Sequence, residues 1–125
     1  MVKSGATTIW EDWDGPTSDN GKGGGVASLN HYSKGAVCEW IFEVMCGIKV
    51  DGRNHFVIAP RPGGTLTYAK ASYDSVFGTI SCEWQNEGKM DDQYVYRLVI
   101  PSNTTATVKL PGKPAQLLGA GTYLF

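Results

Sequence analysis

The sequence has 125 residues, of which 42% are hydrophobic and 18% are charged, enough for one modest globular domain. Its formal net charge is −1 at pH 7, and no segment concentrates Lys or Arg. These features exclude the basic patch of a protein that binds nucleic acid or an anionic membrane surface. No apolar run is long enough to cross a bilayer, and no secretory signal pattern opens the chain, so the compartment is left unknown.

The first 27 residues predict an irregular segment rather than a regular element. Residues 7–14 place two Trp and three acidic side chains within eight positions. Residues 15–25 are mostly Gly, Pro, Ser, Asp and Asn, which predicts a loop.

A helix is predicted over about residues 30–46. Ser28 or Asn30 can cap its start, and Gly47 can follow its end. The segment is apolar around most of its circumference, with only Glu39 and Glu43 marking a polar side. A helix of this kind usually lies between two layers of structure, so we expect a neighbour beyond a single β-domain.

From residue 48 onward the hydrophobic period changes to two, which indicates strands separated by Gly- and Pro-containing turns. Their number and spacing predict a mainly β protein: an antiparallel, jelly-roll-like β-sandwich, preceded by one α-helix and an irregular N-terminal segment. We expect Tyr68 and Tyr73 to pack on this sandwich. The predicted strands are His55–Pro60, Thr65–Ser75, Gly78–Gln85, Gln93–Ile100, Ala106–Leu110 and Gln116–Phe125.

The three cysteines, Cys38, Cys46 and Cys82, are odd in number and widely spaced. Their spacing fits neither a disulfide framework nor a zinc site, and buried free thiols are the expected state. No metal or cofactor is predicted.

Four segments can be compared with a known family: Gly5–Asp14, Ser28–Trp40, Phe56–Tyr73 and Asn103–Val108. In this order they resemble segments of the α-L-rhamnosidases of glycoside hydrolase family 78. The resemblance implies a large enzyme with a catalytic (α/α)6 barrel followed by a β-sandwich. Residues 1–47 would then be a remnant of the barrel, and residues 48–125 the C-terminal sandwich domain. The chain departs from the family between Asp14 and Ser28, in a loop expected to line the sugar pocket.

The resemblance gives Glu11 the role of general base, and the indole faces of Trp10 and Trp13 could stack on a sugar. The alternative is that Glu11 is an ordinary exposed acid on an acidic loop. His31, at the start of the helix, resembles a substrate-binding histidine of the family. Its alternative is a capping or packed side chain.

The resemblance also implies a parent enzyme that releases terminal α-L-rhamnose from a rhamnose-containing glycoside by inversion. Its general acid would lie upstream in the barrel, so the 125-residue piece alone is predicted to be inactive. Its expected partners are that glycoside and the remainder of the barrel. We also expect residues 1–27 to be poorly ordered without the barrel. The alternative is a non-catalytic β-sandwich module that binds carbohydrate or supports a barrel.

Overall fold

The computed structural model describes residues 1–13, 27–86, 88 and 93–125. These residues form two compact units, Met1–Cys38 and Glu39–Phe125. The predicted loop at 15–25, and most of the segment between Asp14 and Ser28 where the chain departs from the family, lie outside the described residues.

Helical structure occupies residues 32–45, close to the predicted 30–46, with a turn at Ala36. The helix start differs from the prediction, because His31 is the N-cap residue and makes no side-chain capping bond. Gly47 follows the end as predicted, with φ of +75°. The last turns widen into a π-helix, in which the Cys46 N–H donates to the Ile41 carbonyl (3.0 Å). The helical elements are η1 (Val2–Ser4), α1 (Tyr32–Gly35), α2 (Val37–Trp40) and η2 (Ile41–Met45).

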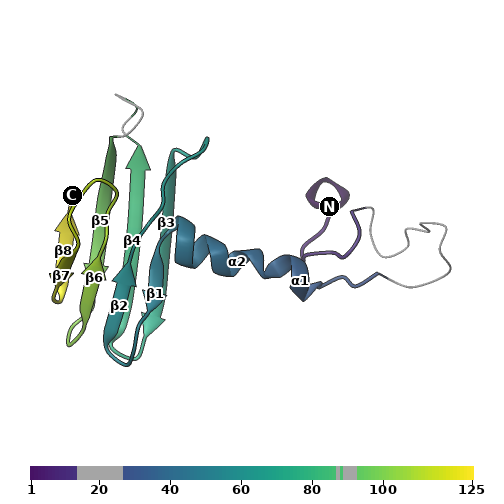
Figure 1. Ribbon diagram of the computed structural model, residues 1–125. Helices are drawn as coiled ribbons and strands as arrows, with labels where there is room; N and C mark the ends of the chain where they lie inside the picture. Colours follow the sequence, from purple (N-terminus) through teal and green to yellow (C-terminus); the bar gives the residue numbers. More distant parts are fainter. Residues whose placement is uncertain (14–26, 87, 89–92) are drawn as a thin grey trace. The chain divides into compact units, whose positions relative to one another are not determined.

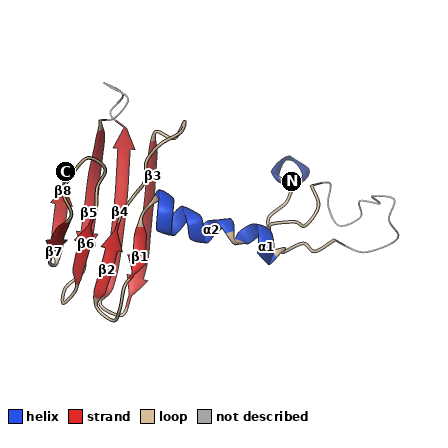
Figure 2. Ribbon diagram, in the orientation of Figure 1, coloured by secondary structure: helices blue, strands red, loops and turns tan. Residues whose placement is uncertain are grey.

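The described residues contain eight strands in two four-stranded sheets. The two sheets pack face to face, as Figures 1 and 2 show. One sheet has the order β1-β2-β6-β7, and the other has the order β3-β4-β5-β8. The predicted sandwich is confirmed. Its strands are β1 (Ile48–Val50), β2 (His55–Ile58), β3 (Tyr68–Ser75), β4 (Gly78–Asn86), β5 (Tyr94–Ile100), β6 (Thr105–Val108), β7 (Gln116–Leu118) and β8 (Gly121–Leu124).

One strand pair is parallel, in a sandwich predicted to be antiparallel. His55 of β2 pairs with Thr105 of β6, and Ile58 pairs with Val108. Between β2 and β6 the chain builds β3, β4 and β5 of the other sheet, and it returns beside β2 in the same direction. The strand pairs β1–β2, β3–β4, β4–β5, β5–β8 and β6–β7 are antiparallel.

The ends of several strands differ from the prediction. Short β1 was not predicted, and the segment Thr65–Ser75 becomes a strand only from Tyr68. Gln116–Phe125 was predicted as one strand, but it divides at Gly119 and Ala120 into β7 and β8, which belong to different sheets. Period-two alternation cannot show this division, because it does not report which sheet a strand joins.

The core lies between the sheets and follows the alternation of β4 and β5. Ile80, Cys82 and Trp84 face inward from β4, as do Tyr96, Leu98 and Ile100 from β5. The buried Trp84 indole donates its Nε1–H to the Met45 carbonyl (2.8 Å), which joins the end of η2 to the core.

Three side-chain predictions need correction. Tyr68 and Tyr73 were expected to pack on the sandwich, yet they are 66% and 44% exposed on β3. Cys46 and Cys82 are buried free thiols as predicted, but Cys38 is exposed. Burial raises the pKa of Cys46 and raises that of Cys82 to about 12, so both core thiols stay protonated at neutral pH.

Two further findings concern the described residues. None of their helices is long and apolar enough to cross a membrane. Within these same ranges, no three His, Cys, Asp or Glu side chains are grouped in a way that could hold a metal ion.

Replacing Trp84 with Phe tests the bond that joins η2 to the core. Trp84→Phe leaves the Met45 carbonyl without its partner and shrinks a fully buried ring, so the free energy of unfolding should fall by about 2 kcal/mol. The matched control is Trp40→Phe, because Trp40 is half exposed and its replacement should cost less than about 0.5 kcal/mol. Urea denaturation measures the free energy of unfolding of both variants. Equal losses for the two variants would contradict this role of Trp84.

Candidate functional site

The candidate site is built from two segments of the N-terminal unit, residues 8–13 and 28–34. The Glu11 N–H donates to the Ser28 carbonyl (2.8 Å), and the His31 N–H donates to the Ile9 carbonyl (2.7 Å). A third bond joins the same two segments: the Thr8 hydroxyl donates to the Leu29 carbonyl. These bonds place the acidic, Trp-containing segment beside the start of α1.

The Glu11 carboxylate is held at one oxygen. Its Oε2 accepts a hydrogen bond from the Ser28 N–H (2.8 Å) and lies 3.8 Å from Nδ1 of His31. The Glu11 side chain is 45% exposed and that of His31 is 27% exposed, so solvent reaches both groups. A fixed, accessible carboxylate beside an imidazole fits a group that exchanges protons with water.

Lys34 is a site residue that the sequence analysis missed. Its ammonium group donates to the Glu11 carbonyl and lies 5.4 Å from the centre of the Trp13 ring. One cation therefore contacts both the chain at Glu11 and the indole face of Trp13. Its place in the sequence offered a signal, since Lys34 lies in the first turn of α1, directly after its N-cap residue His31.

The two tryptophans differ in exposure. Trp13 is 71% exposed, with Lys34 over its ring, while Trp10 is half-buried. The structure thus brings together Glu11, His31 and, through Lys34, Trp13. Among the described residues, no side-chain hydrogen bond, ion pair or ring contact joins Trp10 to this group, although Trp10 is next to Glu11 in the chain.

This arrangement offers one accessible carboxylate that can take a proton from water. Hydrolysis of a glycoside with inversion requires, besides such a base, a carboxylic acid that protonates the leaving oxygen. The two groups stand roughly 6.5–9.5 Å apart, on opposite sides of the sugar ring.

Two family models cover nearly the whole chain. One, described as the bacterial α-L-rhamnosidase C-terminal domain, matches residues 49–124. The chain belongs to the bacterial α-L-rhamnosidase family. The other model, described as the 6-hairpin glycosidase domain of bacterial α-L-rhamnosidases, matches residues 1–45, which include all four predicted site residues.

Curated α-L-rhamnosidases resemble the chain over most of its length. The enzyme of Streptomyces avermitilis is 38% identical over 113 residues, which is 88% of this chain and 11% of that protein. An enzyme of Formosa agariphila is 34% identical over 88% of this chain and 12% of its own length. The chain therefore spans about one-tenth of the length of these relatives.

Solved α-L-rhamnosidase structures share the fold. The structure from Dictyoglumus thermophilum matches with a TM-score of 0.79 and 28% identity, over 100% of this chain and 16% of that one. The Streptomyces avermitilis structure, in complex with L-rhamnose, matches with a TM-score of 0.76 and 32% identity, over 99% of this chain and 14% of that one. The roles of Glu11, His31, Trp10 and Trp13 stay predictions.

The bond between Glu11 and Ser28 can be tested by NMR. Protonating a carboxylate weakens the hydrogen bond that it accepts, so the Ser28 amide proton should move upfield when the wild-type chain is taken from neutral to strongly acidic pH. Glu11→Gln keeps an amide oxygen as acceptor but cannot titrate, and the shift should disappear. Asp12→Asn is the matched control and should retain it. A Ser28 shift that persists in Glu11→Gln would contradict the contact.

Proposed function

We propose that this chain forms the C-terminal part of a longer enzyme that releases terminal α-L-rhamnose from a rhamnose-containing glycoside with inversion. In this proposal residues 1–47 end the catalytic barrel and residues 48–125 form the domain behind it. The observation that carries the proposal is the held, accessible carboxylate of Glu11 beside His31, inside the segment that resembles a glycosidase domain.

Glu11 is the group that would activate water. The Ser28 N–H fixes Oε2, and no hydrogen bond from the described residues engages Oε1. Oε1 can therefore take the proton from a water molecule that attacks the anomeric carbon. Because the base must leave room for this water, Glu11 never bonds to the sugar, and the product has the opposite anomeric configuration.

His31, Trp13 and Trp10 would hold the sugar. The imidazole can bond a sugar hydroxyl, and the exposed indole face of Trp13 can stack on the apolar face of the ring. Lys34 supports this arrangement from the helix, since it contacts both the Glu11 backbone and Trp13. Fixing these groups before the sugar arrives lowers the entropy lost in forming the reactive geometry.

A second candidate function is a module that binds carbohydrate without cleaving it. The exposed rings of Tyr68 and Tyr73 on β3 favour it, because such modules display aromatic side chains on their strands. It does not account for Glu11, which lies outside the sandwich and within the match to the 6-hairpin glycosidase domain. The enzymatic proposal accounts for both segments.

The proposal predicts that the 125-residue chain alone does not release rhamnose from an aryl α-L-rhamnoside, because it lacks the general acid. In the full-length enzyme, Glu11→Gln should lower kcat by roughly 10²–10⁴-fold. Asp12→Asn, which changes the neighbouring acid, should keep kcat within about threefold of wild type. The steady-state rate of release of the aryl group is measured for the isolated chain and for the two full-length variants.

Two results would contradict the proposal. One is measurable turnover by the isolated chain, which would mean that the second carboxyl group lies within these residues. The other is a full-length Glu11→Gln variant as active as Asp12→Asn, which would remove Glu11 from the reaction.

A further inference from the structure

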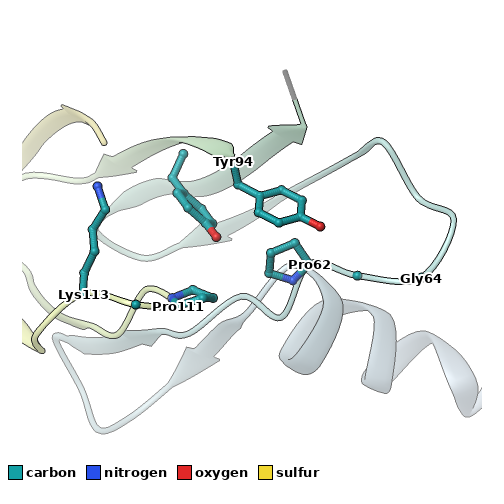
Figure 3. Close-up of a pocket in the computed structure, with 8 residues that line it drawn as sticks. Pro62, Gly64, Tyr94, Pro111 and Lys113 are labelled. Carbon is teal, nitrogen blue, oxygen red and sulfur yellow. The ribbon is translucent and has the colours of Figure 1, made fainter. Parts of the chain in front are cut away.

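A pocket of about 700 Å³ opens in the sandwich unit, between β5 and two turns (Figure 3). Its volume lies within the range of ligand sites in proteins, roughly 300–1,000 Å³. Its walls combine proline and tyrosine rings with glycine backbone and one ammonium group. The lining residues are Pro62, Gly63, Gly64, Tyr94, Tyr96, Pro111, Gly112 and Lys113.

Tyr96 supplies a hydroxyl with which this pocket can bind a polar ligand. The residue is only 3% exposed and lines the pocket, yet its hydroxyl makes no hydrogen bond to any residue that the structure describes. The described residues contain no fully buried side-chain nitrogen or oxygen that lacks a hydrogen-bond partner, so the Tyr96 hydroxyl is reached from the pocket rather than enclosed in the core. Burial raises the pKa of Tyr96 to about 12, so the hydroxyl remains a donor at neutral pH.

The tyrosine rings of the wall are held by other aromatic rings. Trp84 meets Tyr94 edge to face, with centroids 5.7 Å apart and planes at 88°, and Tyr94 lies 6.3 Å from Tyr96. In Figure 3 the Tyr94 ring lies across from Pro62. Rigid apolar rings beside a hydroxyl donor are the usual surface for a sugar, whose ring has apolar C–H faces and polar edges.

Lys113 adds one positive charge at the edge of the pocket. Its ammonium lies 5.4 Å from the centre of the Phe125 ring, and no carboxylate in the described ranges is within ion-pair distance of it. One ammonium balances one negative charge, which suits a carboxylate better than a phosphate dianion.

We propose that this pocket binds a pyranose ring that carries a carboxylate, a hexuronate unit of a glycan. The Tyr96 hydroxyl would bond a ring hydroxyl, Tyr94 and Pro62 would contact the C–H face, and Lys113 would pair with the carboxylate. The site uses no residue of the Glu11 group and does not rest on the function proposed for it.

The full 125-residue chain can be titrated with two sugars that differ at one carbon, while amide shifts are followed by NMR. Methyl α-D-galacturonide carries the carboxylate, and methyl α-D-galactoside is its neutral counterpart. We expect saturable shifts at Tyr94, Tyr96 and Lys113, with a Kd of a few millimolar for the acid and at least fivefold weaker binding of the neutral sugar.

Two variants assign the interactions, each with a matched control. Tyr96→Phe should weaken binding of the acid about threefold or more, whereas Tyr73→Phe, on exposed β3, should not change it. Lys113→Met should remove the preference for the acid over the neutral sugar, whereas Lys109→Met, an exposed lysine, should keep it. Unchanged amide shifts in the rest of the sandwich show that each variant is folded.

Three outcomes would overturn the proposal. They are no saturable shift with either sugar, equal affinity for the acidic and neutral sugars, and shifts that are the same in Tyr96→Phe and Lys113→Met as in the wild type. Failure here leaves the proposed role of Glu11 untouched, because that role is read from turnover of the full-length enzyme.

Discussion

The sandwich unit depends on one buried hydrogen bond, from the Trp84 indole to the Met45 carbonyl at the end of η2. An indole N–H that is fully buried needs an acceptor, and the end of a helix offers carbonyls without partners. The neighbouring Val44 carbonyl accepts from the Arg61 N–H (3.0 Å), so two of these carbonyls are bonded to sandwich groups. Gly47 permits the close approach, since a Cβ there would lie 2.1 Å from the Pro60 nitrogen.

The sequence predicted the features that follow from local hydrophobic pattern. The alternation of apolar and polar residues in β4 predicted both the strand and which of its faces is buried. A strand that lies between a core and solvent must place apolar residues at every second position. Pattern could not show that β2 and β6 are parallel, or that Gln116–Phe125 divides between sheets, since both depend on pairing over long range. Tyr68 and Tyr73 were misplaced for a related reason: aromatic residues favour strands whether or not they are buried.

The candidate site could be predicted in part. Glu11, Trp10, Trp13 and His31 were chosen because their segments resemble a family, and the structure then placed His31 against the Glu11 carboxylate. Lys34 was not predicted as a site residue, because a lysine on a helix usually has a solvated ammonium group. Only the folded structure shows that this ammonium donates to the Glu11 carbonyl. The pocket lined by Tyr96 could not be predicted from the sequence, because its walls come from three segments that are far apart in the chain.

Chemical rescue tests the role of Glu11 most directly. If Glu11 is the base proposed above, Glu11→Ala in the full-length enzyme removes it and leaves a space beside the anomeric carbon, where azide can attack without losing a proton. The account predicts that azide restores cleavage of an aryl α-L-rhamnoside and gives rhamnosyl azide with inverted configuration, identified by NMR. No restoration by azide, or rhamnosyl azide with retained configuration, would contradict the assignment of Glu11 as the base of an inverting enzyme.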